Sequence, residues 1–130
     1  MAKLTQDMKN MISKQQCFYA TVDKNCTPNN APKRSTYIFN DETLLFYEIK
    51  GGTTYRNILD GSKVSVALVD KDLSDGYRFN GVPEVLTSGD IYDKKTEYFT
   101  SNDLDKPIAI VLIHITEIYS LKPGSKASKK

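Results

Sequence analysis

The stretch CFYATVDKNCTPNNAPKRSTYIFNDETLLFYEI, residues 17–49, predicts three β-strands joined by short turns. Residues 17–23 form the first predicted strand, residues 31–40 the second and residues 43–49 the third. The turns KNCTPNN and DE contain the residue types that favour chain reversal. Because short turns join antiparallel neighbours, we expect these strands to form a meander.

The flanking sequence adds three strands and three helices to this meander. Further strands are predicted over residues 63–70, 77–88 and 107–121, with a bulge or bend near Gly81 and Pro83. Helices are predicted around residues 4–12 with Thr5 as the cap, over residues 53–60, and over residues 89–103. The order predicts a mainly β fold with short helices (α+β), a six-stranded antiparallel split β-barrel, closed or nearly closed. This domain spans residues 1–121, and residues 122–130 form a flexible basic tail.

Composition excludes several functional classes. The net charge of +2 comes largely from the tail, so the body lacks the basic face of a nucleic-acid-binding protein. No run is apolar for long enough to cross a membrane, and the first residues do not resemble a signal peptide. Cys17 and Cys26 are too far apart on an extended hairpin to form a disulfide, which suits a reducing compartment. We therefore expect a cytoplasmic protein that binds neither nucleic acid nor membrane.

The segment KGGTTYRN, residues 50–57, leads from the third strand into a helix. Glycines let the backbone approach a ligand closely, the first N–H groups of a helix attract anions, and threonine hydroxyls donate to phosphate oxygens. The segment therefore suits a phosphate, although its spacing is not that of a Walker loop. The alternative is that Gly51 and Gly52 only make the turn while Thr53 or Thr54 caps the helix.

Two adjacent cations, Lys33 and Arg34, are predicted one strand away from this turn. Neighbouring residues of a strand point to opposite faces, so at most one of the two can enter a given cleft. If the second and third strands pair, one cation and the helix start could meet at the same anion. The alternative is that both cations are solvated.

No pattern identifies a catalytic side chain. His114 lies in the apolar run IVLIHITEI, where a core or interface position is expected, and Cys26 has no histidine nearby in sequence. HExxH, CxxC and paired-carboxylate motifs are missing from the sequence. We assign no catalytic residue and expect no metal site.

The run from Phe18 to Asp70 resembles the pyridoxamine 5′-phosphate oxidase-like, FMN-binding split-barrel superfamily, and most closely its small single-domain FMN-binding proteins. The resemblance extends from about residue 17 to residue 86 and, more loosely, through the last strand. It rests on a hairpin, a basic strand, a glycine-rich turn, a helix and a following strand. It implies a homodimer with flavin mononucleotide (FMN) at the subunit interface.

The resemblance also implies the positions that contact the cofactor. The strand PKRST would contact the ribityl chain, the ring or the phosphate, while Tyr47 and Glu48 would lie beside the flavin. Thr53 and Thr54 fall where the oxidases often carry an Arg-Lys pair on the phosphate. The predicted cofactor-binding residues are Pro32, Lys33, Arg34, Ser35, Thr36, Tyr47, Glu48, Lys50, Gly51, Gly52, Thr53, Thr54 and Asn57.

Three departures from the family pattern modify these expectations. Cys26 replaces the hairpin glycine and strains the turn if that position needs a positive φ. With threonines at 53 and 54, positive charge for the phosphate must come from Lys33, Arg34, Lys50 or Arg56. The last strand is not followed by the segment with which the oxidases bind their vitamin B6 substrate, so we do not expect pyridoxamine 5′-phosphate oxidation.

The expected function is that of an FMN-binding flavoprotein, either a small oxidoreductase or an electron-transfer protein. Its electron donor would be NAD(P)H or a redox protein, and the flavin would supply the redox chemistry. Alternatives are a non-catalytic flavin store or sensor, and a barrel that binds a deazaflavin, haem or no cofactor. Haem ranks last because His114 lies within a continuous apolar strand.

Overall fold

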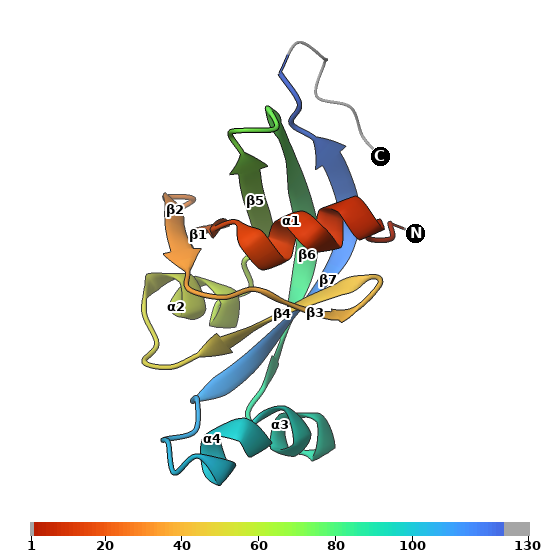
Figure 1. Ribbon diagram of the computed structural model, residues 1–130. Helices are drawn as coiled ribbons and strands as arrows, with labels where there is room; N and C mark the ends of the chain where they lie inside the picture. The colour runs from red at the N-terminus through yellow and green to blue at the C-terminus, as the bar shows by residue number, and fades with distance from the viewer. Residues whose placement is uncertain (1, 124–130) are drawn as a thin grey trace.

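The fold is organised around one seven-stranded antiparallel sheet. The structure is a computed structural model that describes residues 2–123. The strands lie in the order β2-β1-β5-β6-β7-β4-β3 (Figure 1). Their bounds are β1 (Cys17–Val22), β2 (Pro28–Lys33), β3 (Tyr37–Asn40), β4 (Thr43–Glu48), β5 (Val64–Asp70), β6 (Asp75–Leu86) and β7 (Ala109–Ser120). The helices are α1 (Gln6–Lys14), α2 (Thr53–Leu59), α3 (Asp90–Lys95) and α4 (Glu97–Ser101).

The predicted fold class is confirmed, because the sheet is antiparallel, carries short helices and is of the split-barrel type. The strand count was wrong: the sheet has seven strands and is not closed by pairing of its edge strands. The extra strand arises because the predicted strand 31–40 is interrupted at residues 34–36. Its first part pairs with β1 and its second part with β4, so the interruption carries the chain between opposite edges of the sheet. The predicted tail, residues 122–130, lies almost entirely outside the described residues.

The hairpin between β1 and β2 turns through Cys26, whose φ is +63°. The Oδ1 atom of Asp23 accepts hydrogen bonds from the N–H groups of Asn25 and Thr27, at 2.8 and 2.9 Å. A left-handed backbone is unfavourable for a residue with a Cβ atom, and the Asp23 contacts hold the turn against that strain. The strain expected from a cysteine at this position is therefore present.

The core lies inside the curved sheet, and helix α1 covers one end of it. Figure 1 shows α1 lying across the strands near the N-terminus. Thr5 is the N-cap, as predicted, and its hydroxyl accepts from the N–H of Met8 at 3.3 Å. The side chains that the N-terminal region adds to the core are Leu4, Met8, Met11 and Ile12. None of the described helices is long and apolar enough to cross a membrane.

The segment between β6 and β7 forms two short helices, α3 and α4, where we predicted one. The break is at Thr96, which is fully buried and donates its hydroxyl to the carbonyl oxygen of Tyr92 at 2.7 Å. Tyr92 belongs to a second apolar cluster with Leu45, Ile110 and Leu112. Leu45 alternates with core residues along β4, so this cluster lies on the outer face of the sheet.

The β6–β7 ladder contains the predicted bulge. Its register shifts between Asn80 and Gly81. A Cβ atom at Gly81 would lie 2.7 Å from the carbonyl oxygen of His114 and 2.7 Å from the Cγ2 atom of Ile113. Only glycine allows the two strands to approach this closely.

Replacing Gly81 with alanine should lower the free energy of unfolding by about 1–3 kcal/mol, because the β7 backbone must move to admit the methyl group. Urea unfolding followed by circular dichroism measures this change. Gly52→Ala is the matched control, since a Cβ atom there meets nothing within 4 Å and the φ of 164° is extended. Equal stability of the two variants would contradict the close approach at Gly81.

Candidate functional site

The turn between β4 and α2 is shaped by its two glycines. Gly51 has a φ of +77°, and Gly52 is the N-cap of α2, with no side chain capping the helix. The first hydrogen bond of the helix runs from the N–H of Arg56 to the carbonyl oxygen of Gly52, at 2.9 Å. The alternative in which Thr53 or Thr54 serves only as the cap is therefore wrong. Both threonines lie inside the helix.

Glu48 connects this turn to the basic strand. Its Oε1 atom lies 2.8 Å from the Nζ atom of Lys33, and its Oε2 atom accepts from the N–H of Gly51 at 3.1 Å. Glu48 is only 5% exposed. The Lys33 ammonium also lies 4.8 Å from the ring centroid of Phe46. Lys33 therefore points into the barrel, where it neutralises a buried carboxylate.

Thr54 and Asn57 attach α2 to the β1–β2 hairpin. The hydroxyl of Thr54 accepts from the side-chain amide of Asn29 at 3.1 Å. The side-chain amide of Asn57 donates to the hydroxyl of Thr21 at 3.0 Å. Thr54 and Asn57 are each 4% exposed, so these contacts position the helix.

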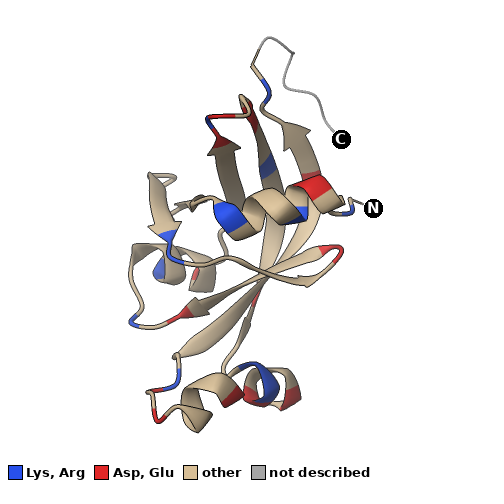
Figure 2. Cartoon of the chain, in the orientation of Figure 1, with Lys and Arg blue, Asp and Glu red and all other residues tan. Residues whose placement is uncertain are grey.

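The exposed donors of the turn belong to Lys50, Thr53 and Arg56. The guanidinium of Arg56 donates to the hydroxyl of Thr53 at 3.2 Å, which places a cation and a hydroxyl side by side. Lys50 and Arg56 form no ion pair with a carboxylate within residues 2–123. Figure 2 shows the basic positions of the end of β2, of α2 and of the loop before it on the same side of the molecule. We call residues 50–56 the 50–56 segment, and its exposed groups suit an anion.

The other predicted residues of the basic strand lie apart from this segment. Arg34, Ser35 and Thr36 form the link between β2 and β3, and Pro32 pairs with Phe18 across the hairpin. Arg34 is exposed and lines a pocket of about 460 Å³ beside the end of α1. Lys33 lines the same pocket, so the prediction that at most one of the two cations can enter a given cleft is wrong here, because Arg34 lies beyond the end of β2 and does not follow the alternation of the strand. Only Lys33 reaches the turn, through Glu48.

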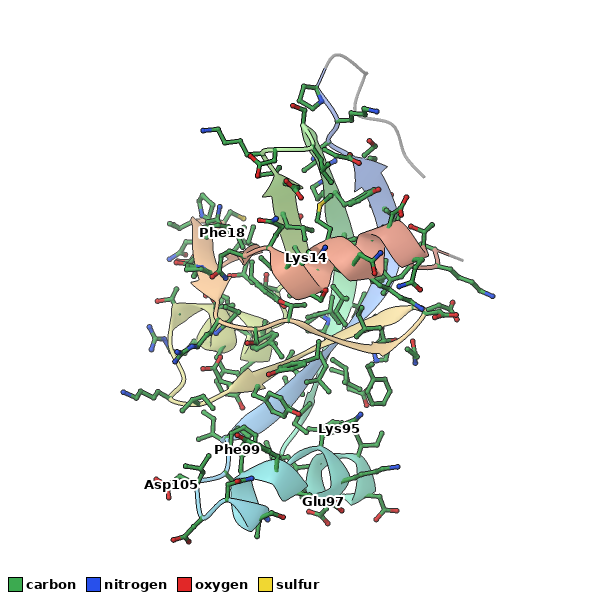
Figure 3. The ribbon with its side chains drawn as sticks, in the orientation of Figure 1. Lys14, Phe18, Lys95, Glu97, Phe99 and Asp105 are labelled. Carbon is green, nitrogen blue, oxygen red and sulfur yellow. The ribbon has the colours of Figure 1, made fainter. Side chains whose placement is uncertain are left out.

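Tyr47 lies on the opposite face of β4 from Glu48. Its ring centroid is 5.3 Å from that of Tyr37 and 5.2 Å from that of Phe99, and its hydroxyl donates to the carbonyl oxygen of Lys95 at 3.0 Å. Figure 3 shows Lys95 and Phe99 on the helical segment below the strands. Burial, and then the neighbouring Tyr37, raise the pKa of the Tyr47 hydroxyl. Tyr47 and Glu48 therefore cannot approach one ligand from the same face of the strand.

Asn29 and Thr21 are site residues that the sequence analysis missed. Residues 29, 31 and 33 share one face of β2, so the alternation that places Lys33 inward also places Asn29 inward. That signal was hidden because residues 28–30 were assigned to a turn. The polar position Thr21 on β1 carried no comparable signal.

The residues considered for chemistry outside this site show no catalytic arrangement. His114 is not in the core: its side chain is 48% exposed, and its Nε2 atom lies 2.8 Å from a carboxylate oxygen of Glu84. Both cysteines are free; Cys26 is exposed, and Cys17 is buried, which raises the pKa of its thiol and keeps it protonated. Residues 2–123 contain no cluster of three potential metal ligands.

Two known proteins resemble this chain over nearly its whole length. A curated relative, the uncharacterized protein MJ0282 of Methanocaldococcus jannaschii, is 32% identical over 131 residues, or 98% of this chain and 87% of that protein. The crystal structure of HupZ from Group A Streptococcus is 36% identical, with a TM-score of 0.84 over 96% of this chain and 99% of that chain.

A more distant structure shares the fold. An FMN-binding protein from Syntrophomonas wolfei is 20% identical, with a TM-score of 0.70 over 87% of this chain and 82% of that chain. The family model for pyridoxamine 5′-phosphate oxidase matches residues 4–122, nearly the whole of the described chain. This chain therefore belongs to the pyridoxamine 5′-phosphate oxidase family.

Proposed function

We propose that this protein is an FMN-binding flavoprotein that acts as a small oxidoreductase or an electron-transfer protein. The observation that carries the proposal is the 50–56 segment, where exposed donors without carboxylate partners surround a glycine turn. The fold relationship to an FMN-binding protein supports it. Two free cysteines fit a reducing compartment, and we propose a cytoplasmic location.

The residues present suit a flavin phosphate. The Thr53 hydroxyl and the first N–H groups of α2 would donate to its oxygens, and Lys50 and Arg56 would balance its charge. Thr54 and Asn57 would hold the helix in place through Asn29 and Thr21. Bound FMN would supply hydride or electron transfer, while the protein supplies binding and orientation.

The absence of an assigned acid or base agrees with redox chemistry that resides on the flavin. Rapid reduction of bound flavin by NADH or NADPH would identify an oxidoreductase. A bound flavin that accepts electrons from no donor would identify the flavin store or sensor considered from the sequence. We do not propose oxidation of pyridoxamine 5′-phosphate.

The purified protein should bind FMN more tightly than riboflavin by at least about tenfold, because riboflavin lacks the phosphate that the 50–56 segment would hold. The absorption spectrum of the protein as purified, followed by titration of the flavin-free form with each ligand, measures the two dissociation constants. Equal affinity for FMN and riboflavin would rule out a phosphate site. No binding of either would rule out the flavoprotein.

Replacing Thr53 with alanine should weaken FMN binding by about 10- to 150-fold, the effect of losing a hydrogen bond to a charged group. Riboflavin binding should not change, and Thr53→Ser should keep the wild-type affinity for FMN. Fluorescence quenching of the flavin gives all of these constants. An unchanged FMN constant in Thr53→Ala would remove Thr53 from the site.

We also propose that the protein is a homodimer. Phe18 on β1 and Val69 on β5 are 45% and 57% exposed, and both line one open apolar pocket on the outer face of the sheet. Uncovered apolar surface of this kind favours association with a second copy.

Light scattering coupled to size exclusion should give twice the chain mass of 14.6 kDa. Phe18→Glu should shift the protein toward monomer, because it places a charge in the proposed interface. Tyr98→Glu is the control, since Tyr98 is an exposed aromatic residue on α4, which contacts β4 through Phe99 and does not line the proposed interface pocket. A wild-type monomer, or a Phe18→Glu dimer, would contradict this interface.

A further inference from the structure

A buried carboxylate, that of Glu48, lies beside the 50–56 segment. The sequence analysis placed Glu48 among the cofactor-binding residues. Both oxygens of Glu48 are engaged inside the protein, Oε1 with the Lys33 ammonium at 2.8 Å and Oε2 with the N–H of Gly51 at 3.1 Å. At 5% exposure, Glu48 has little surface left to offer a ligand.

The Lys33 side chain is also engaged in contacts inside the protein. Its side chain is 19% exposed, and its ammonium lies between the Glu48 carboxylate and the ring of Phe46. If Lys33 moved to an anion at the turn, it would leave the Glu48 carboxylate buried without a counter-ion. Such a loss is far more costly than leaving an exposed cation unpaired. Lys33 should therefore stay with Glu48 when an anion binds.

We propose that Glu48 is the specificity-determining residue of this site: it neutralises Lys33 and thereby limits the preference of the 50–56 segment for a phosphorylated ligand over its unphosphorylated form. The inference rests on the proposed function only in placing the phosphate at this segment. It changes the expected roles of Lys33 and Glu48, because neither contacts the phosphate. Lys50, Thr53 and Arg56 remain as the groups that meet it.

The bond from Gly51 to Glu48 makes the same residue a positioning group. Gly51 has a φ of +77°, and the acceptor of its N–H holds the turn in that conformation. The Gly51 N–H is consequently occupied by Glu48 and is not a donor to the ligand. This part of the inference has a readout that needs no ligand, the chemical shift and exchange rate of the Gly51 amide proton.

The test uses the full chain, labelled with ¹⁵N, in four forms: wild type, Glu48→Gln, the double variant Lys33→Met with Glu48→Gln, and Glu42→Gln. Glu42→Gln is the matched control, because this substitution removes a carboxylate charge in the β3–β4 turn, at the opposite end of β4 from Glu48. Each form is titrated with inorganic phosphate in a buffer free of phosphate, and the amide signals of residues 51–56 report binding. FMN and riboflavin titrations of the same four forms follow.

Glu48→Gln should bind phosphate about three- to tenfold more tightly, because Glu48, which contacts both Lys33 and the turn, no longer cancels the Lys33 charge. FMN should tighten by a similar factor while riboflavin does not change. The double variant should match the wild type within about twofold, since it removes both charges together. The Gly51 amide should shift and exchange faster in Glu48→Gln but not in Glu42→Gln.

Several results would overturn the inference. Unchanged or weaker phosphate binding in Glu48→Gln would show that Glu48 does not reduce phosphate binding by neutralising Lys33. A loss of about tenfold or more in the double variant would make Lys33 a direct phosphate ligand. If Glu48→Gln does not fold, the double variant decides, because it leaves no unpaired charge in the core. Phosphate binding to none of the four forms would also overturn it.

The same titrations separate this inference from the proposed function. If the phosphate results are as expected and FMN does not bind, the flavoprotein proposal fails and the role of Glu48 stands. If FMN binds and Glu48→Gln changes FMN and riboflavin equally, the role of Glu48 fails and the flavoprotein stands.

Discussion

The Lys33–Glu48 ion pair joins two parts of the sheet that share no backbone hydrogen bonds. β2 is one edge of the sheet, and β4 lies beside the other edge strand, β3. The two side chains meet at 2.8 Å inside the barrel. Tyr19 makes a second bridge across the same gap, with its hydroxyl 2.6 Å from that of Thr36 and its ring centroid 5.0 Å from that of Phe46. The open sheet is therefore closed by side chains where backbone pairing does not close it.

This closure also builds the candidate site. The second oxygen of Glu48 holds Gly51, and the chain then enters α2, whose Thr54 and Asn57 bind back to the β1–β2 hairpin. A buried ion pair is stable only when additional hydrogen bonds compensate its loss of hydration, and the Gly51 N–H provides one of them. Barrel closure and the position of the 50–56 segment thus depend on the same few contacts, and a change in one should alter the other.

Local pattern predicted the elements better than it predicted their partners. Strand alternation, the Thr5 cap and the bulge at Gly81 are all present, because each depends on neighbours within a few residues or on one close approach. The break at residues 34–36 was missed because Arg34, Ser35 and Thr36 are acceptable strand residues. They leave the sheet because the chain passes there from its pairing with β1 to its pairing with β4.

Sequence by itself determined the fold class and the glycine turn leading into a helix. These follow from backbone geometry and from side-chain period, which are properties of the chain alone. Only the tertiary structure decided that Lys33 is neutralised by Glu48 and that Thr54 is occupied by Asn29. Both contacts join residues from different elements, so they depend on how these elements pack against one another. Whether a donor remains available to a ligand is therefore settled by packing.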